Sequence, residues 1–256
     1  MKLPARFTDL EGKSVFISGG GSGIGEFLTE GFVSQGAKVA FVQRSDATAL
    51  CDRLENEYGN RPLFLPCDVT DIAALKHALE QSAKAHGAVT VLVNNAAWDN
   101  RHKLEDLDPE GWDHMMNVNI RHHFFAAQAV APGMRAAGGG SIINYSSISY
   151  MMGNAGYPAY VSAKAGITGL TRGLARELGP DNIRVNALMP GWVLTERQRD
   201  LWVTPEGLAG HLERQCLKQE IEPLDMVSPT LFLASETSRM MTGQALVVDA
   251  GVVVTG

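Results

Sequence analysis

The sequence predicts one α/β domain built on a doubly wound parallel sheet of about seven strands, with helices on both faces. Short runs that are apolar throughout recur along the 256 residues, as expected for parallel strands buried on both faces. Longer segments with helical spacing of apolar residues separate these runs. A glycine-rich turn follows the first run, at a position where such folds bind ligands.

Each expected element follows from this alternation, and right-handed crossovers then give a Rossmann-type arrangement. The expected strands are 13–18, 38–43, 62–66, 89–94, 141–145, 183–188 and 245–249. The expected helices are 23–35, 47–58, 72–86, 109–137, one that carries Tyr160 and ends near 178, and 228–234. No linker or repeat divides residues 1–256, so we expect a single domain.

The stretch 191–221 interrupts the alternation of strands and helices. It is long, contains Trp192, Trp202 and Pro205, and follows the sixth expected strand. Because ligands in such folds bind beyond the carboxyl ends of the strands, this stretch is a candidate substrate lid. The alternative is a packed surface excursion without a role in binding.

Composition excludes several classes of protein. The formal net charge of −6 argues against nucleic acid or an anionic membrane as partner, and 45% apolar with 20% charged residues is typical of a soluble enzyme. Three scattered cysteines predict neither a disulfide framework nor a zinc site, and no histidine pair has metal-ligand spacing, so no metal is expected. No apolar run is long enough for a signal peptide or a membrane span, which leads us to expect a cytoplasmic protein.

The glycine-rich turn has the chemistry of a dinucleotide site. Gly19, Gly23 and Gly25 stand in the segment S-G-G-G-S-G-I-G between the first strand and the first helix. Without Cβ atoms the backbone can turn tightly and approach a pyrophosphate, and the helix start offers free N–H groups. Many loops need glycine, so the position after the first strand is what favours this interpretation.

The end of the second strand bears on the choice between NADP and NAD. An acidic residue there would bond the ribose 2′-hydroxyl and repel a 2′-phosphate. This chain has the neutral Gln43 and then Arg44, a cation suited to phosphate, so we favour NADP; NAD stays open if Gln43 bonds the hydroxyl. Asp68, after the third strand, is expected either to contact the adenine edge or to cap the next helix.

Tyr160 and Lys164 lie four residues apart, on one face of the expected helix. A tyrosine working as a base near neutral pH needs its pKa lowered by roughly three units, or about 4 kcal/mol. A neighbouring ammonium is one of the few groups that can lower it. Ser147, upstream in N-Y-S-S-I-S, would then hold the substrate oxygen. The alternative is a chance pair on a solvated helix.

Taken together, these motifs resemble the short-chain dehydrogenase/reductase family over essentially the whole chain. The matching residues are the Gly19/Gly23/Gly25 turn, Asn94-Asn95-Ala96, Asn119, Ser147, Tyr160 with Lys164, and Pro190-Gly191 with Thr195. The resemblance implies an oxidoreductase in which Tyr160 is the general acid/base and Ser147 orients the substrate oxygen. It also implies that Lys164 lowers the tyrosine pKa, that Asn119 holds a water in a proton relay, and that Thr195 contacts the carboxamide.

The candidate cofactor-binding set follows from the same resemblance. It comprises Gly19, Ser22, Gly23, Ile24, Gly25, Gln43, Arg44, Asp68, Val69, Asn95, Tyr160, Lys164, Pro190 and Thr195. The chain departs from the family pattern at Ala97, where glycine is more common, and at Tyr150, where a small residue is frequent.

A narrower resemblance, to bacterial sugar 1-dehydrogenases, lies in segments expected to surround the substrate. It covers 99–104, 119–122, 128–134 and 195–218. It implies oxidation of the anomeric hydroxyl of a cyclic aldose to the aldonolactone. The expected loops also carry hydrogen-bonding and aromatic groups that suit a sugar: Trp98, Asp99, Asn100, Ser149, Tyr150, Asn154 and Trp192. The alternative for Trp98 and Trp192 is that they pack in the core and do not contact a substrate.

Two other functions stay open at this stage. One is a carbonyl or 3-ketoacyl reductase of the same family, which NADP and Arg44 would fit. The other is a dinucleotide-sensing protein without catalysis, although such proteins commonly lack the tyrosine or the lysine. The resemblance further implies a homotetramer, in line with long helices that are apolar around much of their circumference.

Overall fold

The computed structural model describes residue 3 and residues 5–254, and it has one sheet of seven parallel strands. Their order is β3-β2-β1-β4-β5-β6-β7, so the order reverses between β1 and β4. The strands are β1 (Ser14–Ser18), β2 (Lys38–Gln43), β3 (Leu63–Pro66), β4 (Val91–Asn94), β5 (Gly140–Tyr145), β6 (Ile183–Pro190) and β7 (Ala245–Val248). The predicted fold class is confirmed, and no strand end differs from the expected one by more than two residues.

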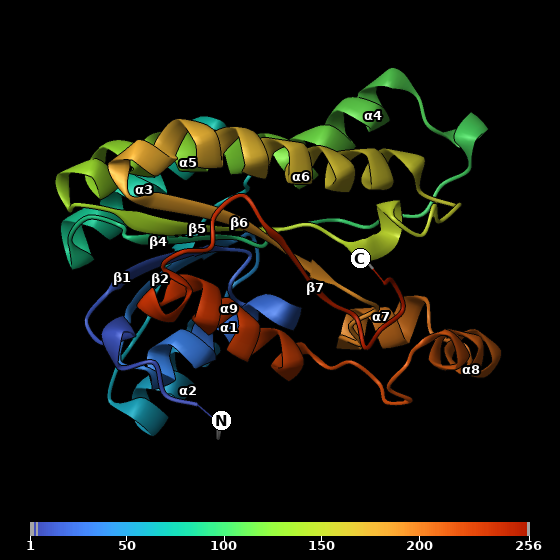
Figure 1. Ribbon diagram of the computed structural model, residues 1–256, viewed down its shortest axis with the longest axis horizontal. Helices are drawn as coiled ribbons and strands as arrows, with labels where there is room; N and C mark the ends of the chain where they lie inside the picture. Colours follow the sequence, from blue (N-terminus) through green and yellow to red (C-terminus); the bar gives the residue numbers. More distant parts are fainter. Residues whose placement is uncertain (1–2, 4, 255–256) are drawn as a thin grey trace.

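Helices cover both faces of the sheet, as Figure 1 shows. On one face lie α3 (Ile72–His86), α5 (His122–Ala136) and α6 (Pro158–Leu178), with α4 (Pro109–Met116) beyond the end of the sheet. On the other face lie α1 (Gly23–Ser34), α2 (Thr48–Tyr58) and α9 (Val227–Ala234). Short 3₁₀ turns occur at Thr8–Leu10, Leu104–Asp106, Ile148–Tyr150, Gly179–Asp181, Pro223–Met226 and Glu236–Ser238.

Two hydrophobic cores follow from the strand periodicity. Successive strand residues point to opposite faces, so Phe16 packs in the core under α3, α5 and α6, while Val15 and Ile17 pack under α1, α2 and α9. On β5, Ile142 and Ile143 divide in the same way. All five of these side chains are fully buried. The continuous apolar runs of the sequence therefore indicate a sheet that is covered by helices on both faces.

The long helix expected at 109–137 has a break that the sequence pattern did not predict. Between α4 and α5 the backbone forms a π-helical turn, Asn117–Arg121, which carries Asn119. Such turns insert an extra residue into a helix and often occur at functional sites. The turn brings the fully buried Asn119 beneath the loop that follows β4.

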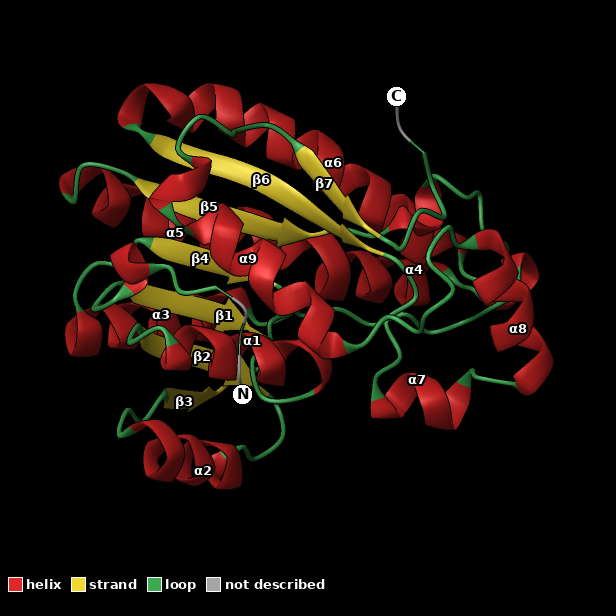
Figure 2. Cartoon of the chain, turned by 60° about the horizontal axis from the view of Figure 1, so that its bottom comes forward, coloured by secondary structure: helices red, strands yellow, loops and turns green. Residues whose placement is uncertain are grey.

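The candidate lid, 191–221, contains two helices that periodicity did not reveal. They are α7 (Glu196–Leu201) and α8 (Pro205–Arg214), each N-capped by a threonine, Thr195 and Thr204. Figure 2 shows both beyond the carboxyl ends of the strands, away from the helices that cover the sheet. No helix of the described residues is long and apolar enough to span a membrane.

Candidate active site

The glycine turn after β1 has the shape that a bound pyrophosphate requires. Gly19 and Gly23 have φ of +68° and +55°, in the left-handed region that favours glycine. A Cβ on Gly25 would lie 1.8 Å from the Gly19 carbonyl oxygen, so that position admits no larger residue. The side chain of Ser22 does not cap α1, which leaves the first N–H groups of the helix for an anion.

The loop after β4 braces this turn. The Ser18 hydroxyl accepts bonds from the backbone N–H groups of Asn95 and Ala96 at 3.0 and 3.1 Å. The Asn95 side chain donates to the Ser18 and Gly19 carbonyls at 3.2 and 3.0 Å. The predicted contact residue Asn95 thus joins the ends of β1 and β4, on either side of the point where the strand order reverses.

The residues at the ends of β2 and β3 form the adenosine side of the turn. Gln43 donates to the Ser45 carbonyl at 2.9 Å and lies against Gly21, where a Cβ would meet it at 2.5 Å. Arg44 is exposed and pairs with Asp68 at 3.9 Å. Asp68 does not cap α3, because Asp71 does; it accepts from the N–H and hydroxyl of Thr70.

The predicted contact Val69 is buried in the core beside this turn, with 7% of its surface exposed. Its side chain therefore helps fix the end of β3, and any contact of Val69 with a nucleotide would come from its backbone.

A cavity of about 600 Å³ lies at the carboxyl ends of the strands, between the sheet and the lid. We call it the main cavity. The residues predicted from the sequence that line it are Ile24, Asn95, Ser147, Ser149, Asn154, Tyr160, Lys164, Pro190, Trp192 and Thr195. One space therefore joins the glycine turn, the tyrosine–lysine pair and the lid. Catalytic and cofactor residues separated by more than a hundred positions meet there.

Ser147, Tyr160 and Lys164 form one wall of this cavity. Ser147 begins the short turn after β5, and its hydroxyl accepts from the Ser149 N–H at 3.1 Å. The Lys164 ammonium lies 5.4 Å from the centre of the Tyr160 ring and donates to the Tyr145 carbonyl at 2.8 Å. The two side chains come from successive turns of α6, as the spacing predicted.

The electrostatics of this pair differ from the expectation. Burial raises the pKa of Tyr160, and the Asp99 carboxylate raises it further, while the hydrogen bond from Ser147 opposes both. Burial also lowers the pKa of Lys164 to about 7. The burial that raises the tyrosine pKa also disfavours the Lys164 ammonium, so the expected lowering of the tyrosine pKa by Lys164 stays a prediction.

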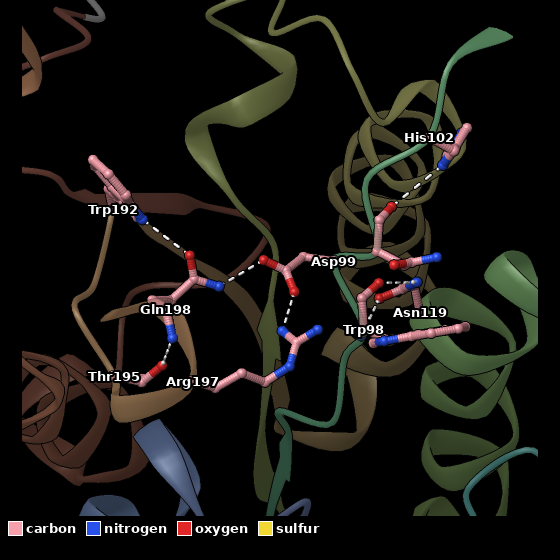
Figure 3. A network of polar contacts seen from close by, with 9 residues as sticks. Trp98, Asp99, His102, Asn119, Trp192, Thr195, Arg197 and Gln198 are labelled. Atoms are coloured by element: carbon pink, nitrogen blue, oxygen red, sulfur yellow. Dashed lines mark hydrogen bonds and ion pairs between the residues drawn. The ribbon is translucent and has the colours of Figure 1, made fainter. Parts of the chain in front are cut away.

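Asn119 lies outside the main cavity. Its amide accepts from the Trp98 N–H at 2.9 Å and donates to the carbonyls of Trp98 and Met115 at 3.0 and 2.9 Å. The side chain thus fixes the loop after β4 onto the π-helical turn (Figure 3). A role in a proton relay stays a prediction, and its amide has no donor left for it.

Three predicted substrate residues lie away from the main cavity. The Trp98 ring packs edge-on against His114, with 5.2 Å between centroids, and Asn100 is exposed outside the lining. Tyr150 lines a different hollow, beside β7, and its hydroxyl is bonded to Thr168 and Met189. The helical turn after Ser147 directs this ring away from Tyr160, which corrects the expectation that Tyr150 lies close to the substrate.

Asp99, expected in a candidate sugar loop, and Trp202, expected in the lid, both line the main cavity. Sequence reasoning did not single out several other lining residues: Arg101 from the loop after β4, and Arg197, Gln198, His211 and Arg214 from the lid. Arg101 stacks on the Trp202 ring at 4.3 Å. These positions fall in the segments of the narrower resemblance, which was the signal that could have found them.

No group of three or more metal-ligating side chains occurs among residues 3 and 5–254. The polar groups that line the main cavity include hydroxyls, amides, guanidinium groups, the Lys164 amine, the His211 imidazole and one carboxylate.

Comparison with known proteins identifies the family. A family profile described as enoyl-(acyl carrier protein) reductase matches residues 19–253. The chain belongs to the short-chain dehydrogenase/reductase family. The resemblance inferred from the motifs is thereby confirmed, and the protein is an oxidoreductase of that family rather than a non-catalytic sensor.

Individual relatives align over nearly the whole chain. A probable galactose dehydrogenase, GalD, of Rhizobium meliloti is 50% identical over 255 residues, covering 98% of this chain and 100% of its own. D-xylose 1-dehydrogenase of Caulobacter vibrioides is 47% identical over 250 residues, covering 96% and 98%. The structure of L-sorbose reductase from Gluconobacter frateurii, with NADPH and L-sorbose, superposes with a TM-score of 0.89 at 29% identity, covering 97% and 99%.

The glycine turn, the braced loop after β4 and the uncapped start of α1 fit a nicotinamide dinucleotide, the cofactor class of this family.

Proposed function

We propose that this short-chain dehydrogenase oxidises the anomeric hydroxyl of an aldose sugar to the aldonolactone, with NADP or NAD as the oxidant. The observation that carries the proposal is the main cavity, where Ser147, Tyr160 and Lys164 stand opposite a lid rich in hydrogen-bonding and aromatic groups. A polyol needs such groups around its ring, and the galactose and xylose dehydrogenases among its relatives support the same class of substrate.

The protein groups divide the proton chemistry. The Ser147 hydroxyl holds the C1 oxygen, and Tyr160 accepts the proton of the C1 hydroxyl. Lys164, bonded to the Tyr145 carbonyl, places its amino group beside the tyrosine ring. The bound oxidised nicotinamide supplies the hydride acceptor and a positive charge that lowers the pKa of the phenol. The lactone leaves and hydrolyses in water.

The sugar-facing groups of the lining support a polyol over a fatty acyl chain. Asn154 donates to the Tyr157 hydroxyl at 3.0 Å, and the Ser149 hydroxyl is buried without a hydrogen-bond partner among the described residues. A buried hydroxyl without a partner costs about 1–3 kcal/mol, which a sugar hydroxyl would recover.

We infer NADP as the preferred cofactor from Arg44, whose guanidinium is exposed at the end of β2 beside the turn. Its pairing with Asp68 is long, at 3.9 Å, and leaves most of its donors for a 2′-phosphate. A homotetramer and a cytoplasmic location, both expected from the sequence, stay proposals.

A panel of aldoses tests the function. Xylose, arabinose, galactose, fucose, rhamnose and glucose are each incubated with NADP and with NAD, and reduced nicotinamide is followed at its absorbance band. We expect turnover of at least one aldose, with lactone as the product. Turnover of ketones or 3-ketoacyl esters with none of these sugars would favour the reductase alternative and reject the proposal.

A further inference from the structure

The main cavity contains one carboxylate among the described residues, that of Asp99 in the loop after β4. Its side chain is 22% exposed, so one side faces the cavity while the other is held by protein. Figure 3 shows this group between Gln198, which is bonded to Trp192, and Arg197, in one chain of polar contacts.

Both oxygens of this carboxylate are held by the lid. Arg197 pairs with Oδ1, and the Gln198 amide donates to Oδ2 at 2.6 Å. The Trp192 indole N–H donates to Gln198 Oε1 at 3.0 Å, which orients the amide so that its NH₂ group faces Asp99. The carboxylate is therefore fixed in direction by groups from the end of β6 and from α7.

A carboxylate so held still has capacity to accept. An ionised carboxylate has about four lone-pair sites, and Arg197 and Gln198 occupy two. Hydrogen bonds to a charged acceptor are the strong ones. Two neighbouring hydroxyls of a sugar ring are the donors that such a group accepts best.

The same carboxylate lies near the reacting end of the cavity. Asp99, Tyr160 and Lys164 line the same cavity. The Asp99 charge disfavours the Tyr160 phenolate and favours the Lys164 ammonium, although burial still leaves the pKa of Lys164 lowered. A sugar ring whose C1 hydroxyl lies at Tyr160 would therefore place its nearer hydroxyls within reach of Asp99.

We propose that Asp99 is the specificity-determining residue of the cavity, accepting hydrogen bonds from ring hydroxyls of the aldose. Arg197, Gln198 and Trp192 are positioning residues that hold this carboxylate. The inference rests on the proposed function and assigns the side chain that distinguishes one sugar from another.

The test compares Asp99→Asn with Asp200→Asn, which removes an exposed carboxylate from the same lid outside the cavity lining. The kcat and KM are measured for the best aldose and for each of its monodeoxy analogues. Nucleotide Kd and thermal unfolding are measured alongside. We expect Asp99→Asn to raise the KM for the aldose about 10- to 100-fold, since a hydrogen bond to a charged group contributes about 1.5–3 kcal/mol.

The change in KM on going from the aldose to each deoxy analogue separates hydrogen bonding by Asp99 from a merely structural role, which would leave that change as it is in the wild type. In the wild type, a deoxy sugar that lacks a hydroxyl bound by Asp99 should have a KM about tenfold higher or more than the aldose. In Asp99→Asn, the KM of the same deoxy sugar should differ from that of the aldose by less than about twofold. Nucleotide Kd stays unchanged, and Asp200→Asn behaves as the wild type. A second variant, Gln198→Leu, loosens the carboxylate and raises KM with kcat nearly kept.

An Asp99→Asn variant that oxidises the aldose with wild-type KM, or that keeps the wild-type discrimination against every deoxy sugar, overturns the inference. If Asp99→Asn does not fold, an unchanged KM in Gln198→Leu overturns it instead. A wild type that oxidises no aldose rejects the proposed function itself, so the two failures are distinguishable.

Discussion

Tyr160 is a residue whose surroundings oppose the state it needs as a base. Burial and the Asp99 carboxylate both favour the neutral phenol, and the neighbouring Lys164 is itself driven towards the neutral amine. Within the protein, burial therefore opposes charge on both members of this pair.

We expect Tyr160→Phe to lose turnover by about a thousandfold or more, since it removes the proton acceptor and keeps the ring. Nucleotide affinity should stay within a few-fold of the wild type, which a fluorescence titration measures. The matched control is Tyr150→Phe, whose hydroxyl lies at the other hollow and whose kinetics should match the wild type. Appreciable activity in Tyr160→Phe would remove the tyrosine from its proposed role.

Arg44 allows a separate prediction about the cofactor. Arg44→Ala removes the exposed guanidinium and its pairing with Asp68, without touching the glycine turn. We expect the kcat/KM for NADP to fall about tenfold or more while that for NAD changes little. If the ratio of kcat/KM for NADP to kcat/KM for NAD does not change, Gln43 rather than Arg44 would contact the adenosine ribose, and the proposed preference for NADP would be rejected.

At the scale of elements, the turn between β1 and α1 has almost no tolerance for a larger side chain at Gly25. Gly25→Ala would place a methyl group inside the Gly19 carbonyl, and a backbone atom cannot move away as a flexible side chain can. We expect loss of nucleotide binding together with destabilisation of about 1–3 kcal/mol or more.

Gly173→Ala on α6 is the matched control, because no atom lies within 4 Å of the position that its new methyl group would take. It should keep binding and stabilise the protein by up to about 1 kcal/mol, since alanine is the better helix former. Thermal unfolding and nucleotide titration of both variants check the pair. Equal behaviour of the two would refute the steric argument.

The elements also show how far the sequence could predict the site. Tyr160 and Lys164 were predictable because a fixed spacing on one helix fixes their relation. The direction of Tyr150 was not, because it depends on how a three-residue turn closes after Ser147. The π-helical turn at Asn119 and the Asp99–Gln198 bond arise from contacts between segments, which periodicity along one segment does not encode.

At the scale of the molecule, the seven-stranded sheet was predictable for a simple reason. A strand covered by helices on both faces must be apolar throughout, and such a continuous apolar run can be recognised in each segment of the sequence by itself. The lid was predicted only by its length and place, since α7 and α8 are short and pack little of their surface into either core.

The buried histidines give a prediction for the whole fold. His122 and His123 are fully buried, and burial lowers the pKa of His122 to about 4 and that of His123 well below its usual value. The unfolded chain takes up their protons below pH about 6.5 and the folded chain does not. Stability is therefore present above pH 6.5 and is lost as pH falls towards 4, by about 1.4 kcal/mol per pH unit for each histidine.

Melting temperatures between pH 7.5 and 4.5 measure this loss. The variant His123→Gln should flatten the curve, whereas His77→Gln, at an exposed position, should not alter its slope. Parallel curves for all three proteins would show that other groups cause the acid sensitivity.

The proposed catalytic groups and the lid groups come from different parts of the chain. Ser147 lies in the turn after β5, and Tyr160 and Lys164 lie on α6, while α7 and α8 form one continuous stretch after β6. Gene segments encoding such a stretch can be exchanged between homologous enzymes as a cassette. A library of lids grafted at 191–221, with a compatible residue at 99, would diversify substrate range while the reaction itself stays the same.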